Sequence, residues 1–112
     1  DDEAASLTVE GEDSVGAGGS GMAQLLRRGA TAAVCASDAL ALGAFIDNAG
    51  VTRPDVVGFD DTPVARAIGL PSLRQPADEL ARIVIDKVLA QLSGTEEAGG
   101  VLVRPVLETR GH

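Results

Sequence analysis

Short apolar runs alternate with longer stretches of helical periodicity along this chain, and that alternation constrains the fold more than any other feature. The run Thr31–Ala36 is nearly all small and apolar, as expected of a parallel strand that is covered on both faces. Strands that alternate with helices are typical of right-handed parallel sheets. We therefore predict an α/β protein with a three-layer arrangement, in which helices flank a parallel sheet. The expected strands are 6–10, 31–36, 55–59 and 72–74, followed by extended stretches at 101–103 and 106–109, and the expected helices are 20–28, 39–49, 63–68 and 78–92.

Polar residues and glycines predict where these helices begin and end. Asp38 stands where the N-cap of the helix 39–49 is expected, and Asp60, Asp61 or Thr62 can cap the next helix. The longest helix carries an apolar face. That face consists of Leu80, Ala81, Val84, Ile85, Val88, Leu89 and Leu92, and the residues expected to end helices are Gly29, Gly50 and Gly94.

Two of the expected strands finish in polar residues, Ser37-Asp38 and Asp60-Asp61. In open parallel sheets, ligands bind outside the carboxyl ends of the strands. These four side chains are therefore predicted to gather at one edge of the sheet. The end of the third strand, Arg74-Gln75, can reach the same edge. The sequence thus predicts a binding site there.

The charge balance excludes several classes of function. The chain has 112 residues, with 17 acids against nine bases, and no Lys/Arg cluster exceeds two residues, which excludes a basic nucleic-acid surface. The acids are dense in residues 1–13, which we expect to be a solvated, frayed end. One Cys and one His leave no material for a disulfide or a multi-Cys zinc site. No stretch approaches the ~20 apolar residues of a membrane helix, no signal peptide is evident, and Met22 is the only Met, so we read the chain as a piece of a longer protein.

A glycine run, Gly16–Gly21, matches the G-x-G-x-x-G pattern of dinucleotide-binding turns, with Asp38 as an acid downstream. In those turns the glycines follow the strand directly, whereas here residues 11–15 intervene. We therefore interpret the run as a flexible, glycine-rich start of a helix.

The carboxylates Asp38, Asp60 and Asp61 could in principle hold Mg²⁺, because that ion prefers oxygen ligands. Phosphoryl transfer usually adds a basic residue at the site, but the only Lys is Lys87 in the long helix. Helix capping accounts for Asp38 and Asp61, which leaves Asp60 unexplained. Cys35, on an apolar strand, is interpreted as a buried small hydrophobe. We expect no catalytic residue, no metal and no cofactor.

Four segments resemble the lactose/galactose repressor family of bacterial transcription regulators. Thr31–Gly43 (TAAVCASDALALG) resembles that family's "TA-apolar-apolar-C-A-N-D-x-x-A-x-G", and Val56–Asp61 matches its "VVGFDD". Leu73–Pro76, followed by Glu79-Leu80, resembles "T-V-R-Q-P-x-x-E-L-G", and Leu107–Gly111 resembles the closing "L-x-x-R-x-S". The order and spacing agree over most of the chain, from about Ala30 onward.

The resemblance implies the C-terminal part of an effector-binding domain that is built like a type I periplasmic binding protein. Such domains have two α/β lobes joined by crossover strands, with a small ligand, often a sugar, between them. By position, the resemblance implies that Ser37, Asp60 and Gln75 face the ligand and that Asp38 and Asp61 serve as scaffold. It also implies that about 76–104 belongs to the other lobe, that the protein is a homodimer, and that it contacts DNA only through a helix-turn-helix headpiece missing from this chain.

The sequence departs from the family pattern in three places. Ser37 stands where Asn is usual, which shortens the reach of that side chain. The segment Arg53–Val56 lacks a few residues that the family has before the "VVGFDD" strand. The run Gly16–Gly21 is unusually flexible for the helix expected there.

We therefore expect the effector-binding and dimerisation module of a cytoplasmic bacterial transcriptional repressor, whose effector is a sugar or a related small molecule, and we expect no enzyme activity. One alternative with the same fold is a periplasmic sugar-binding protein of a transporter. A second alternative, from another class, is a nucleotide-dependent or Mg²⁺-dependent phosphoryl-transfer enzyme that uses the glycine run or the acids.

Overall fold

A computed structural model describes residues 2–48, 54–95 and 100–110. The chain forms two units, of which unit 1 comprises Asp1–Arg74 with Leu107–His112, and unit 2 comprises Gln75–Val106. The predicted helix stop at Gly50, the predicted short loop from Arg53, Gly99 and the closing residues 111–112 lie outside the described residues. Unit 1 therefore carries the sheet and the helices around it.

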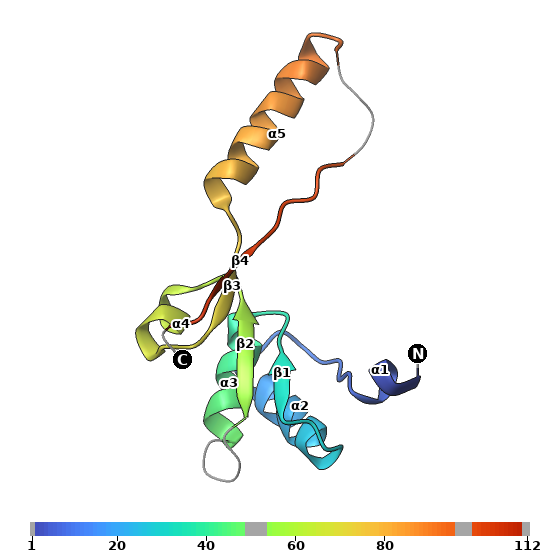
Figure 1. Ribbon diagram of the computed structural model, residues 1–112, viewed down its shortest axis with the longest axis vertical. Helices are drawn as coiled ribbons and strands as arrows, with labels where there is room; N and C mark the ends of the chain where they lie inside the picture. Colours follow the sequence, from blue (N-terminus) through green and yellow to red (C-terminus); the bar gives the residue numbers. More distant parts are fainter. Residues whose placement is uncertain (1, 49–53, 96–99, 111–112) are drawn as a thin grey trace. The chain divides into compact units, whose positions relative to one another are not determined.

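The sheet has four strands in the order β1 (Ala32–Val34), β2 (Asp55–Phe59), β3 (Ser72–Arg74) and β4 (Val106–Glu108) (Figure 1). β1 runs parallel to β2, with Val34 opposite Val57. β2 runs parallel to β3, with Phe59 opposite Leu73. The prediction of an α/β fold with a parallel sheet flanked by helices is confirmed. As a consequence, the carboxyl ends of β1, β2 and β3 point the same way.

The predicted strand at 6–10 is wrong. Residues Asp2–Ser6 form a short helix, α1, and the residues after it are in no strand. An extended stretch becomes a strand only when its backbone pairs with a neighbour, and no described strand pairs with this one. Two acids before two alanines favour the first turn of a helix instead.

The first large helix, α2 (Val15–Arg27), begins earlier than the predicted residue 20. Ser14 is its N-cap and accepts a hydrogen bond from the Ala17 N–H at 3.1 Å. The glycine run therefore lies in the first half of a helix, which confirms the prediction of a glycine-rich helix start. α2 ends as predicted, with Gly29 in the left-handed region.

The glycines let α2 pack closely against α3 (Asp38–Asn48). A Cβ at Gly18 would overlap the backbone oxygen of Leu40, and a Cβ at Gly43 would overlap the backbone oxygen of Val15. The run is thus a contact surface for a neighbouring backbone.

The core of unit 1 is small and aliphatic, since its buried hydrophobic residues are Met22, Ala41, Ala44, Val56, Ala65 and Leu70. On β1, Ala33 packs partly against this core, whereas Val34 is 79% exposed. The prediction that this strand is covered on both faces is therefore wrong for the described residues, since Ala32 and Val34, which share one face of the strand, are exposed.

The remaining helices agree with the sequence. α4 (Pro63–Ile68) begins at its predicted proline and is followed by Gly69 in the left-handed region. In unit 2, α5 (Ala77–Leu92) is the longest helix, has no buried residue, and stops before Gly94, which has a φ of 76°. None of the helices in the described ranges is long and apolar enough to cross a membrane.

Candidate functional site

The ends of β1 and β2 place Ser37 and Asp60 at the same level of the sheet. The pairing of Val34 with Val57 is extended by a bond from the Cys35 N–H to the Val57 carbonyl at 2.8 Å. Ser37 and Asp60 each follow three residues after the Val34–Val57 pair. The predicted gathering of polar residues at this edge therefore follows from the parallel register.

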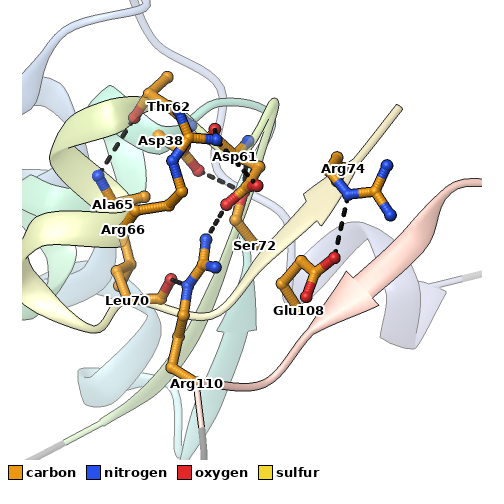
Figure 2. A network of polar contacts seen from close by, with 10 residues as sticks. All are labelled: Asp38, Asp61, Thr62, Ala65, Arg66, Leu70, Ser72, Arg74, Glu108 and Arg110. Atoms are coloured by element: carbon orange, nitrogen blue, oxygen red, sulfur yellow. Dashed lines mark hydrogen bonds and ion pairs between the residues drawn. The ribbon is translucent and has the colours of Figure 1, made fainter. Parts of the chain in front are cut away.

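Asp38 is a buried cross-link beneath that edge (Figure 2). One of its carboxylate oxygens accepts a hydrogen bond from the Ser72 hydroxyl at 2.6 Å. The other accepts from the Thr62 N–H, also at 2.6 Å. A side chain at Gly58 would overlap the Asp38 carboxylate. Asp38 thus joins the start of α3 to β3 and to the start of α4.

Asp61 is also buried, and its charge is matched by two arginines (Figure 2). Arg66 lies 3.2 Å from one carboxylate oxygen, and Arg110 forms an ion pair with the other. The Asp61 N–H donates to the Ser72 hydroxyl at 2.9 Å, so Ser72 connects both buried acids. Arg110 also donates to the Leu70 carbonyl at 3.2 Å, which attaches the segment after β4 to the loop between α4 and β3.

The predicted cap of α3 is wrong by one residue, whereas the cap of α4 is one of the three candidates predicted for it. The Ser37 hydroxyl, not Asp38, accepts the Leu40 N–H at 3.2 Å, and Thr62, not Asp61, caps α4 by accepting the Ala65 N–H at 3.3 Å. Thr62 was among the residues proposed for that cap. In both cases a hydroxyl caps the helix, and the adjacent carboxylate turns inward to bind groups from other elements.

Asp60 differs from both buried acids because it is exposed. Its N–H donates to the Leu73 carbonyl at 2.9 Å, and its φ is 101°. Asp61, the next residue, has a φ of 53°. Two adjacent residues other than glycine in the left-handed region are uncommon, and such backbone strain concentrates at functional sites.

Ser37 makes a contact that sequence reasoning missed, since its hydroxyl donates a hydrogen bond to the Asp13 carboxylate. Asp13 lies just before α2, in the segment interpreted as a solvated end. No sequence signal connected the two residues, because the contact depends on how the segment before α2 passes the end of β1.

The third predicted ligand residue is in the other unit. Arg74, at the end of β3, pairs with Glu108 of β4 at 3.0 Å. Gln75 follows it as the first residue of unit 2 and is exposed. The structure therefore brings Ser37 and Asp60 to one edge of unit 1, whereas Gln75 belongs to unit 2.

The alternative chemistries find little support in the geometry. The glycine run is inside α2 rather than in a turn after a strand, so it is no phosphate loop. Within the described ranges, no three His, Cys, Asp or Glu side chains are grouped to hold a metal. Cys35 packs partly against the core, and burial raises the pKa of its thiol, which disfavours the reactive thiolate.

Comparison with known proteins finds bacterial transcription regulators. The "HTH-type transcriptional regulator MalR" of Streptomyces coelicolor is 35% identical over 95 residues, which cover 78% of this chain. A regulatory protein of the LacI family from Chloroflexus aggregans has a TM-score of 0.73 at 28% identity and covers 94% of this chain and 44% of its own. A Lac repressor dimer bound to operator and the anti-inducer ONPF has a TM-score of 0.71 at 30% identity and covers 88% of this chain and 37% of its own.

These matches are partial with respect to the relatives. The chain spans 28% of the length of the curated regulators that it matches. No protein-family profile matches the chain.

Proposed function

This chain belongs to the lactose/galactose repressor (LacI/GalR) family of transcription regulators, and on that premise we propose that it forms part of an effector-binding module. The effector is a small molecule, of which a carbohydrate is the proposed class. Because the relatives named above are regulators, we propose this function in preference to a transporter's binding protein or a phosphoryl-transfer enzyme, and we propose that the protein acts in the cytoplasm without enzyme activity.

The observation that carries the proposal is that the four polar residues at the sheet edge fall into two pairs, one that stabilises the fold and one that remains available to a ligand. Asp38 and Asp61 are buried and bonded to groups of the fold. Ser37 and Asp60 lie at the ends of adjacent parallel strands, where open α/β sheets bind ligands. Asp60 is exposed on a strained backbone, and its carboxylate accepts hydrogen bonds only, which suits sugar hydroxyls.

Several finer parts of the function remain proposals that rest on the family. Gln75 is proposed as a further ligand residue, and residues 76–104 are proposed to belong to a second lobe. A homodimer and DNA contact through a separate helix-turn-helix headpiece are proposed for the whole regulator. The exposed apolar side chains of α5 support a packing partner for that helix in the longer protein.

The test replaces Asp60 with Ala in the protein expressed from its complete gene. Isothermal titration with glucose, galactose and maltose identifies a carbohydrate that binds, and the variant is then titrated with it. Loss of charge-assisted hydrogen bonds worth about 1.5–3 kcal/mol should weaken affinity roughly 10- to 150-fold.

Asp55→Ala is the matched control, because Asp55 is an exposed acid at the opposite end of the same strand. It should bind the carbohydrate as the unaltered protein does. Normal binding by the Asp60 variant would remove Asp60 from the site, and binding of none of the three sugars would contradict the carbohydrate class.

A further inference from the structure

The hydrogen-bonding capacity of Ser37 is almost fully used by the protein. A serine hydroxyl has one hydrogen to donate and two lone pairs that accept. The hydrogen goes to the Asp13 carboxylate, and one lone pair accepts the Leu40 N–H at 3.2 Å. Only one lone pair therefore remains for a ligand, and Ser37 meets that ligand as an acceptor.

Asp60, the other ligand-facing residue of this edge, is likewise an acceptor when ionised. The arginines of unit 1 nearest to the edge are all engaged by acids, since Arg66 and Arg110 pair with Asp61 and Arg74 pairs with Glu108. Among the described residues, this edge thus offers acceptors and negative charge, but no unmatched arginine to balance an anionic ligand.

We propose that Asp13 is a positioning residue of the effector site, which holds the Ser37 hydroxyl as an acceptor and so selects effectors that present hydroxyl or amine donors over phosphorylated or carboxylated ones. The inference rests on the proposed function. It also gives a role to the serine that stands where the family usually has Asn. An Asn amide presents both donors and an acceptor, whereas Ser37 held by Asp13 presents only an acceptor.

The experiment compares neutral sugars with anionic counterparts, using the protein expressed from its complete gene. Glucose and galactose are titrated against glucose 6-phosphate, galactose 1-phosphate and gluconate, and the ratio of neutral to anionic affinity is the readout. The unaltered protein should bind a neutral sugar and discriminate against its anionic counterpart.

Asp13→Ala frees the Ser37 hydrogen, which can then be donated to an anionic sugar. The ratio of neutral to anionic affinity should therefore fall about tenfold, the effect of one hydrogen bond. Asp13→Asn keeps an oxygen that accepts from Ser37 and should retain the ratio. Glu12→Ala is the charge control, because it removes the neighbouring exposed acid without touching Ser37.

Each outcome decides the inference. A fall in Asp13→Ala with retention in both other variants supports it. An equal fall in Glu12→Ala or in Asp13→Asn overturns it, because bulk charge would then explain the selection, and preferred binding of an anionic sugar or of no neutral sugar overturns it as well. Circular dichroism checks folding, and Asp13→Asn decides the matter if Asp13→Ala does not fold.

Asp60→Ala separates this inference from the proposed function. If that variant loses affinity while Asp13→Ala keeps the unaltered ratio, the effector site stands and the role of Asp13 is wrong. If Asp60→Ala binds normally, the assignment of the site to this edge fails.

Discussion

The two units of the chain differ in how far they bury their hydrophobic and charged side chains. In unit 1, leucine and valine side chains such as Leu70 and Val56 are buried, and the charge of Asp61 is enclosed by two arginines. In unit 2, α5 has no buried residue, and its apolar face is open, with Leu92 80% exposed and Val84 59% exposed. This open face nevertheless shows the apolar periodicity of a helix that packs against a neighbour.

The difference shows that an apolar helix face in the sequence indicates that the face needs a packing partner, but not that the described chain supplies one. α2 packs against α3, and α3 packs on β2, so each of these helices has a neighbour that covers its apolar face. Among the described residues of unit 2, α5 is followed by residues 100–105, which are in no helix or strand, and none of the residues of α5 is buried. Burial of an apolar surface stabilises by about 25 cal/mol per Å², so stability should be concentrated in unit 1.

The largest expected effect comes from Asp61→Asn. Removing the charge leaves Arg110 without its buried partner, and breaking a buried ion pair costs about 3–5 kcal/mol. Denaturant unfolding of the chain should show this loss. Asp86→Asn, on the exposed surface of α5, should stay within about 0.5 kcal/mol of the unaltered chain. Equal effects of the two changes would break the contrast between the units.

The second test applies one chemical change to both units. Leu70→Ala should cost about 2–4 kcal/mol, because Leu70 is 3% exposed and truncation leaves a cavity. Leu92→Ala should cost less than about 0.5 kcal/mol, because that side chain is largely in solvent. Thermal and denaturant unfolding measure both. A cost for Leu92 as large as that for Leu70 would show that α5 is covered in solution.

The smallest expected effects come from two glycine substitutions that test the close packing of α2 against α3 inside unit 1. Gly43→Ala should destabilise by about 1–3 kcal/mol, because its Cβ would overlap the backbone of α2. Gly16→Ala, in α2 and with open space around it, should stabilise by about 0.5 kcal/mol. The sign of the change in unfolding midpoint separates the two, and a stabilising Gly43→Ala would contradict the close helix contact.

Local patterns predicted the sheet strands and the later helices well. The strands at 55–59 and 72–74 agree with β2 and β3, and the helix 63–68 agrees with α4, because a short apolar run or a proline marks each of them. The errors occurred where tertiary contact decides. The strand expected at 6–10 has no partner, and the helix expected from residue 20 begins at Val15, with its glycine run against a neighbouring backbone.

The sequence was enough to predict the position of the candidate site at the edge of the sheet, but not the network of hydrogen bonds and ion pairs around it. Parallel register alone brings Ser37 and Asp60 to one level, and the sequence contains that information. The roles of the adjacent acids depend on partners that are distant along the chain, such as Ser72 for Asp38 and Arg110 for Asp61. No local spacing connects these pairs, so their acids were interpreted as caps.

The attachment of Arg110 to Leu70, 40 positions earlier, has a consequence for how the chain folds during synthesis. Unit 1 is discontinuous, because unit 2 is inserted between β3 and the closing residues. Until those residues leave the ribosome, the Asp61 carboxylate has Arg66 but lacks Arg110, the second of its two arginines. Closing so long a loop is slow, since its entropy must be lost before the contact forms. Nascent chains that stop short of Arg110 should therefore have an incomplete ion-pair network at the sheet edge, which can be completed only after unit 2 has been synthesised.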